Sequence, residues 1–169
     1  RAGIRRLNIS LDTLRPERFA KITRHAKLET VLLGIKKAVA AGFSPVKVNV
    51  VVIKGLNEDE IENFIKFAKE AGVIVRFIEQ MPFGYFEGLR KNDPEHGEVA
   101  PGYVSLDKIE KEMVEKYGLK LGETSGAGPG RHYGFVGFIP ARSRPFCHEC
   151  NRIRLTPDGK LRLCLDFPY

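Results

Sequence analysis

The sequence has few cysteines, no long apolar run and fewer acidic than basic residues. Only three cysteines occur among 169 residues. They cluster in one segment, and an odd, clustered set argues against the disulfide framework of a secreted protein. No apolar run approaches the roughly 20 residues that cross a membrane, and no signal peptide opens the chain. We therefore expect a cytoplasmic protein without membrane attachment, long enough to bury its own core.

The charge balance is basic. Lys and Arg number 28 against 21 Asp and Glu, which gives a formal net charge of +7. This excess predicts an anionic partner, which could be a nucleotide, a nucleic acid or an acidic membrane surface. The aromatic residues do not interleave with the basic ones as a nucleic-acid stacking platform requires. We therefore expect no nucleic-acid partner.

Hydrophobic periodicity divides the first half of the chain into alternating strands and helices. Alternation of apolar and polar residues predicts strands at 7–12, 46–53 and 73–81. A wider apolar period predicts helices at 16–24 and 28–41, and one that begins after Asn57 and ends at Gly72. Asn57 and Glu60 have the spacing of a capping box. This order indicates βαβ units, and hence an α/β fold with a parallel sheet.

One face of the predicted strands is polar. Parallel strands buried on both faces should be nearly continuous apolar runs. Here one face instead presents Asn8, Ser10, Asp12, Lys47, Asn49, Arg76 and Gln80. A partial barrel whose polar faces line a cavity explains this pattern. A sheet with one solvated face explains the alternation equally well.

The second half of the chain has a different composition. Glycine and proline break any period from Pro82 to Gly102, which predicts a long loop. Ser105 is expected to cap a helix that runs to Tyr117. Residues 125–134 are predicted to be a flexible glycine-rich loop and 135–139 a short strand. We expect three parts: a barrel segment at 1–84, a linker at 85–104 and a C-terminal region at 105–169.

The three cysteines have the spacing C-x2-C-x13-C, at Cys147, Cys150 and Cys164. Between them, residues 153–156 and 160–163 are predicted to form a hairpin around an Asp-Gly turn. Such a hairpin can return Cys164 toward the other two cysteines, so that three thiolates converge. The spacing therefore predicts a metal site.

The number of cysteine ligands leaves the metal open. A structural zinc site needs a fourth ligand, for which His148 or His132 is available. An iron–sulfur cluster held by three thiolates would instead leave one iron open to a substrate. Spacing alone favours zinc, and three buried cysteines without metal is the remaining alternative. Arg152 and Arg154 share one face beside the site, which suggests a bound oxyanion, although a solvated basic strand face has the same pattern.

Several ordered motifs resemble one known family. The cysteine segment reads F-C-H-E-C-N-R-I-R-L-T-P-D-G-K-L-R-L-C-L, and upstream come L-N-I-S-L-D-T-L, V-K-V-N-V-V-V-I-K-G-L-N, V-R-F-I-E-Q-M-P and G-A-G-P-G-R-H-Y. Together they resemble the molybdenum-cofactor biosynthesis protein A family, whose members are radical S-adenosylmethionine (SAM) enzymes that act as GTP 3′,8-cyclases. The resemblance covers nearly the whole chain.

The resemblance implies a fold and a set of site residues. The fold would be the C-terminal part of a partial (β/α) radical-SAM barrel, followed by a small α+β cluster-binding region. Cys147, Cys150 and Cys164 would hold a [4Fe-4S] cluster whose open iron faces the guanine of GTP. The GTP-binding residues would be Lys47, Arg76, Arg152 and Arg154. The SAM-binding residues would be Ser10 and Met81.

The resemblance also implies a reaction and partners. A radical derived from SAM would abstract hydrogen from C3′ of the GTP ribose, and C3′ would attack C8 of guanine to give 3′,8-cyclo-GTP. The protein would position GTP and exclude water. Cyclic pyranopterin monophosphate synthase would act next in the pathway, and the enzyme could form a homodimer. Another radical SAM enzyme with an auxiliary cluster and a zinc-ribbon nucleic-acid module are the alternatives.

The chain departs from the family pattern in three ways. It has no C-x3-C-x2-C motif for the first cluster, and it lacks the family's C-terminal tail that ends in Gly-Gly. His132 stands where an aromatic residue is expected. The chain starts at Arg1 and ends at Tyr169, so we expect both ends to have been cut from a longer protein. Without the missing parts it would at most bind ligands.

Overall fold

The core of the protein is a five-stranded, mostly parallel β-sheet. The computed structural model describes residues 3–24, 27–81, 102–122, 130–150 and 152–164. The strands are β1 (Leu7–Ser10), β2 (Val46–Val52), β3 (Ile74–Glu79), β4 (Arg131–Tyr133) and β5 (Val136–Ile139), in the order β1-β2-β3-β5-β4. β1, β2, β3 and β5 pair in parallel, and β4 is antiparallel to β5. The predicted α/β class with a parallel-dominated sheet is confirmed.

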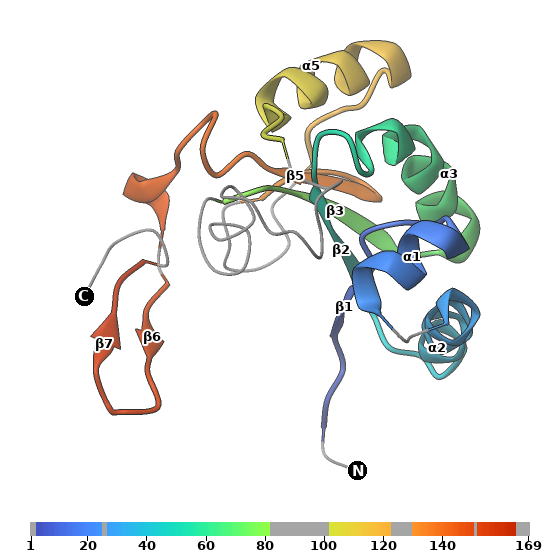
Figure 1. Cartoon of the computed structure of the whole chain (residues 1–169), viewed down its shortest axis with the longest axis horizontal. Coiled ribbons are helices and arrows are strands. Elements are labelled where there is room, and N and C mark those ends of the chain that lie inside the picture. Colours follow the sequence, from blue (N-terminus) through green and yellow to red (C-terminus); the bar gives the residue numbers. More distant parts are fainter. Residues whose placement is uncertain (1–2, 25–26, 82–101, 123–129, 151, 165–169) are drawn as a thin grey trace.

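The helices pack on one face of this sheet (Figure 1). They are α1 (Pro16–Thr23), α2 (Leu28–Ala40), α3 (Ile61–Ala71), which follows the short 3-10 turn η1 (Glu58–Glu60), and α5 (Leu106–Tyr117). The alternate residues of β2 that the sequence marked as apolar, Val46, Val48, Val50 and Val52, are buried under them. Ile61, Phe64, Ile65 and Ala68 form the predicted inner stripe of α3. In the described ranges, no helix is long and apolar enough to cross a membrane.

The capping-box prediction at Asn57 and Glu60 is wrong. Neither residue makes a side-chain capping bond, and η1 precedes the α-helix. The Asn57 side chain instead accepts a hydrogen bond from the backbone N–H of Ile53 (2.8 Å) and donates one to the carbonyl of Val51 (2.8 Å). The buried Glu60 carboxylate accepts the hydroxyl of Thr13 (2.7 Å). Both side chains are engaged by the ends of β1 and β2, so they are not available to the helix.

The prediction of a flexible loop over 125–134 is also wrong where the structure describes it. Residues 130–134 are described, and β4 lies within them. A tight turn joins β4 to β5, with Gly134 at a φ of 68°. This positive φ favours glycine, since it lacks a Cβ. The glycine at this position therefore makes a hairpin rather than a loose loop.

The cysteine segment forms a small hairpin apart from the sheet (Figure 1). It begins with a 3-10 turn, η2 (Cys147–Glu149), and continues with β6 (Arg154–Leu155) and β7 (Leu161–Arg162). The hairpin prediction is confirmed, although each strand has two residues and is shorter than expected. The turn is closed by Thr156, whose N–H donates to the carbonyl of Lys160 (2.9 Å). Most of the predicted linker at 85–104 lies outside the described residues, and the proposed division of the chain stays a prediction.

Candidate functional site

A row of polar residues crosses the sheet on the face opposite the helices. Strand register aligns Ser10 with Asn49, Asn49 with Arg76, Arg76 with Gly137, and Gly137 with His132. Register partners point to the same face of a sheet, so four strands contribute a polar side chain to one row and β5 contributes Gly137. Lys47 lies two residues before Asn49 on β2, on the same face, and is in register with Asn8. The structure thus brings together most of the polar face that alternation predicted.

Arg76 lies at the centre of this face. Its Nε donates to Oδ1 of Asn49 (2.9 Å) and its Nη2 donates to Oδ1 of Asn8 (2.8 Å). Both acceptors are neutral carboxamides, so they orient the guanidinium without neutralising its charge. Burial and the nearby positive charge of Arg152 lower the pKa of Arg76. Arg152 belongs to the cysteine segment, so a charge from that segment contributes to the field at the sheet face.

Two further groups on this face, Lys47 and His132, have pKa values that are lowered by burial and by neighbouring positive charges. Burial, followed by the charges of Arg76 and Arg6, lowers the pKa of Lys47. Burial, followed by Lys47 and Arg76, lowers the pKa of His132. The one acidic residue of the predicted face, Asp12, has its pKa raised by burial, and its Oδ1 accepts the N–H of Val51 (2.8 Å). An anion placed here would relieve the repulsion among these cations.

Glu79, at the end of β3, was not predicted to have a role. Its side chain is only 1% exposed, and its carboxylate accepts hydrogen bonds from Tyr103 Oη (2.9 Å), Leu106 N (3.1 Å), Arg142 N and Ser143 N (2.8 Å). Burial opposes ionisation of Glu79, but the hydrogen bonds from Ser143, Arg142 and Leu106 outweigh it and lower its pKa. Glu79 therefore ties the start of α5 and the segment that leads to the cysteines to the end of the sheet.

Ser105 occupies the predicted N-cap position of α5, but it makes no side-chain capping bond. The amide of Leu106 is satisfied by Glu79, and the amide of Asp107 donates to Oγ of Ser143 (3.1 Å). The helix start is thus capped by residues that are distant in sequence. Capping rules that use a single sequence consider only local partners, so they could not have predicted Glu79 and Ser143.

Arg144 fastens the cysteine segment to α5. Its Nη1 lies 2.7 Å from Oδ1 of Asp107, and its Nη2 pairs with Oε2 of Glu110. The Glu110 side chain is 2% exposed and also accepts the hydroxyl of Tyr133 (2.6 Å). A charged network therefore ends three residues before Cys147 and sets where the cysteine segment leaves the sheet.

The three candidate cysteine ligands make fewer described contacts than Arg144 does. Cys147 and Cys150 are exposed and joined by a 3-10 turn, in which Cys150 N donates to the carbonyl of Cys147 (3.3 Å). Cys164 is partly buried, and its carbonyl accepts Nε of Arg162 (2.9 Å). None of these three described cysteines forms a disulfide. In the part of the chain that the structure describes, no three His, Cys, Asp or Glu side chains are arranged to hold a metal ion.

The donor set nevertheless fits a thiolate-held iron–sulfur cluster. Three cysteines that form no disulfide, on one short segment, supply the soft ligands that such clusters require. Of the fourth ligands considered for zinc, His132 belongs to β4 in the sheet, and the exposed His148 lies in η2 between the first two cysteines. Arg152 is exposed and Arg154 is half-buried at the start of the hairpin.

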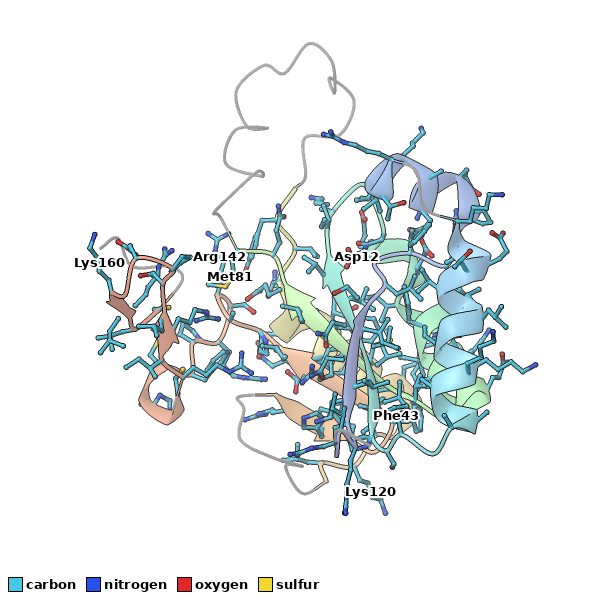
Figure 2. All side chains as sticks on the ribbon, turned by 90° about the horizontal axis from the view of Figure 1, so that it is seen from below. Asp12, Phe43, Met81, Lys120, Arg142 and Lys160 are labelled. Atoms are coloured by element: carbon cyan, nitrogen blue, oxygen red, sulfur yellow. The ribbon has the colours of Figure 1, made fainter. Side chains whose placement is uncertain are left out.

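Ser10 and Met81 lie at the carboxyl ends of two parallel strands of the sheet. Ser10 ends β1, and the half-buried Met81 follows the end of β3. In α/β sheets, ligands bind outside the carboxyl ends of parallel strands. In the view of Figure 2, Met81 lies between Asp12, which follows β1, and Lys160 at the tip of the hairpin. Both predicted SAM-binding residues are therefore at the edge where a ligand is expected.

Comparison with known proteins decides the family. The family model described as Molybdenum Cofactor Synthesis C matches residues 73–167, more than half of the chain. This chain belongs to the Molybdenum Cofactor Synthesis C family. A second model, the Radical SAM superfamily, matches residues 1–68. In this family member, the Radical SAM match ends within α3 and the Molybdenum Cofactor Synthesis C match begins just before β3, so one continuous sheet contains strands from both.

Several relatives of this Molybdenum Cofactor Synthesis C protein are named GTP 3′,8-cyclase. The protein of Heliobacterium modesticaldum named GTP 3′,8-cyclase is 44% identical over 173 residues, covering 97% of this chain and 50% of the relative. GTP 3′,8-cyclases of Alkaliphilus metalliredigens and Petrotoga mobilis are 45% and 42% identical, over 97% and 98% of this chain and 49% and 50% of the relatives. The chain spans about half the length of the curated relatives that it matches.

Proposed function

We propose that this chain forms the GTP site and the auxiliary-cluster site of a radical SAM GTP 3′,8-cyclase in molybdenum cofactor biosynthesis. The observation that carries the proposal is the basic face opposite the helices, where Arg76 is held by two neutral carboxamides. Among the residues that the structure describes, no carboxylate pairs with Arg76, and such a guanidinium is suited to binding phosphate. Nearly full-length similarity of this chain to proteins named GTP 3′,8-cyclase supports GTP as the anion.

In the proposed site, four basic residues hold the triphosphate. Lys47 and Arg76 belong to β2 and β3, and Arg152 and Arg154 would approach from the cysteine segment. The lowered pKa values of Lys47 and Arg76 support this assignment. Burial is the main cause at both residues, and it is followed by the charges of Arg76 and Arg6 at Lys47 and by that of Arg152 at Arg76. Binding of the triphosphate would offset the repulsion among these charges and join the hairpin to the sheet.

Cys147, Cys150 and Cys164 would hold the [4Fe-4S] cluster in this proposal. When bound, such a cluster offers one iron that no protein thiolate occupies, and SAM supplies the radical chemistry together with a first cluster on residues outside this chain. Ser10 and Met81 would contact SAM at the carboxyl edge of the sheet. The contribution of the chain's own residues is to orient the nucleotide and to shield one side of it with the sheet.

We also propose that the sheet is part of a partial barrel whose polar lining is the basic face. The enzyme would be cytoplasmic, convert GTP to 3′,8-cyclo-GTP, form a homodimer, and deliver its product to cyclic pyranopterin monophosphate synthase. The alternation of buried and part-buried residues along β2 supports the barrel, because such a lining needs one polar face.

GTP titration of the anaerobically reconstituted chain tests the proposal. Reconstitution is expected to give a brown protein with about four iron atoms per chain. Arg154→Ala should then weaken GTP binding by about 1.5–3 kcal/mol, the contribution of hydrogen bonds to charged groups. Lys160→Ala is the matched control, because it removes one positive charge from the same hairpin at its exposed tip, and it should bind GTP as the wild type does.

Three outcomes would contradict the proposal or part of it. A colourless protein with stoichiometric zinc would exclude the cluster and favour a zinc-ribbon module. Equal GTP affinity of Arg154→Ala and the wild type would remove Arg154 from the site, and a chain that retains iron but binds no GTP would favour a different radical SAM reaction.

A further inference from the structure

His132 occupies a place on the basic face that a glycine makes possible. It lies in β4, in register with Gly137 of β5, which in turn is in register with Arg76 of β3. A Cβ added to Gly137 would lie 3.1 Å from His132 Nδ1 and 3.3 Å from its Cε1. The imidazole therefore lies over the bare backbone of β5, directed from the edge strand toward Arg76.

The imidazole is buried but incompletely paired. His132 is 8% exposed, and among the described residues its Nδ1 is the one buried side-chain nitrogen or oxygen atom that has no hydrogen-bond partner. Its neighbour in the row, Arg76, has partners at Nε and Nη2. Buried polar atoms in folded proteins almost always have a partner, so an orphaned atom beside a binding face indicates a ligand or a bound water.

The charged groups that surround His132 are all basic, and they come from three strands of the sheet and from the cysteine segment. Lys47 comes from β2, Arg76 from β3 with Arg152 beside it, and Arg131 precedes His132 on the opposite face of β4. Burial first, and then Lys47 and Arg76, hold the pKa of His132 below its usual 6.5, so the free imidazole is neutral near neutral pH. A neutral imidazole has one N–H donor and one acceptor nitrogen.

We propose that His132 is a further phosphate-binding residue of this face, whose Nδ1 donates a hydrogen bond to the polyphosphate that Lys47 and Arg76 hold. This assignment rests on the proposed function, since the ligand is the triphosphate of GTP. An anion beside the imidazole would offset the charges of Lys47 and Arg76 and so favour the protonated imidazole. Binding would then be accompanied by proton uptake at His132, which a lysine or arginine could not provide.

The test compares variants of the reconstituted chain in titrations with GTP and with inorganic tripolyphosphate, at about pH 6 and about pH 8. His132→Phe should lose about tenfold in affinity for both ligands, as expected for one hydrogen bond to a charged group. The loss should be larger at the lower pH. His132→Asn, whose amide reaches roughly the position of Nδ1, should recover part of the affinity without the extra gain at low pH. Arg131→Ala removes a positive charge from the other face of the same strand and should leave the affinity unchanged.

The outcomes separate this inference from the proposed function. If His132→Phe binds both ligands as the wild type does while Arg76→Ala loses affinity, His132 is not part of the site and the proposed function stands. A loss for GTP but not for tripolyphosphate would overturn the phosphate contact. If the wild type binds neither ligand, both proposals fail.

A measurement on the unmodified chain covers the case in which His132→Phe does not fold. The imidazole nitrogen resonances of the wild type, followed by long-range 15N–1H NMR, should shift for His132 toward the protonated form when GTP is added. His132→Asn supplies the assignment among the four histidines of the chain. An unchanged His132 signal at saturating GTP would overturn the inference.

Discussion

The sheet and the cysteine hairpin hold their candidate site residues in different ways. Arg76 is fixed by strand register, by two carboxamide partners and by a core directly beneath its strand, in which Val75 and Phe77 are fully buried. The hairpin has two strands of two residues each. Its apolar residues Leu155 and Leu161 remain 71% and 67% exposed. One half of the site is thus built by packing and the other is not.

This difference indicates where each half obtains its order. A hairpin without a buried apolar face is marginal in water, whereas metal binding contributes folding free energy directly. We therefore expect the sheet face to be formed in the chain by itself and the hairpin to become ordered when its three cysteines hold a cluster. The Arg144 network and Glu79 fix only the point where the segment leaves the sheet.

Removing a core side chain should produce the largest effect. Phe77 is fully buried, with its ring centroid 6.2 Å from that of Phe64 on α3 and 5.4 Å from that of Phe138 on β5. Phe77→Ala should lower the free energy of unfolding by about 3–5 kcal/mol, through lost burial and the cavity left behind. Urea denaturation followed by circular dichroism measures it.

Leu161→Ala is the matched truncation in the hairpin. Because Leu161 is exposed, its loss should change the unfolding free energy by less than about 0.5 kcal/mol. A destabilisation comparable to that of Phe77→Ala would mean that the hairpin belongs to the same cooperative unit as the sheet, and the contrast between the two regions would disappear.

A smaller effect is expected from Glu79, which links the two regions. Glu79→Gln keeps the shape of the side chain but removes the charge that accepts four hydrogen bonds. We expect a loss of about 1.5–3 kcal/mol in unfolding free energy at about pH 7. Glu112→Gln, on the exposed surface of α5, is the control and should have almost no effect.

The Glu79 effect should depend on pH in a defined direction. Hydrogen bonds keep the pKa of Glu79 below 4.5 in the folded state despite its burial. Its contribution is therefore present above pH 4.5 and is lost as the pH falls through the folded-state pKa. Wild type and Glu79→Gln should differ most near neutral pH and converge in acid. A difference that stays constant in acid would show that Glu79 acts through its shape rather than its charge.

The sequence was sufficient for those parts of the fold that depend on periodicity. The alternation of Val46, Val48, Val50 and Val52 identified the buried face of β2, and Lys47 and Asn49 identified the polar one. The polar face was thus predicted, and the structure adds the register that aligns Ser10, Asn49 and Arg76. The Cys147–Cys164 hairpin followed from its Asp-Gly turn, a short-range signal.

Long-range partners could not be predicted from local pattern. Asn57 and Glu60 matched a capping box, but their hydrogen bonds go to residues near the ends of β1 and β2. β4 has only three residues, too few to show a period. Glu79 did leave a signal, since it falls in the buried phase of β3 with Val75 and Phe77. A charged residue in such a phase indicates a buried hydrogen-bond acceptor.

The smallest effect is expected from exposed ion pairs, where the two regions should not differ. Arg15 Nη2 lies 2.8 Å from Oδ2 of Asp59, and the two side chains are 43% and 45% exposed. Arg15→Ala should cost less than about 1 kcal/mol in urea denaturation, because both charges are largely hydrated and Arg18 still pairs with Asp59. Added salt should reduce even this difference. Lys160→Ala breaks the equivalent exposed pair with Asp158 in the hairpin and should likewise leave unfolding almost unchanged. A large effect of Arg15→Ala would mean that surface charge, rather than burial, stabilises the sheet relative to the hairpin.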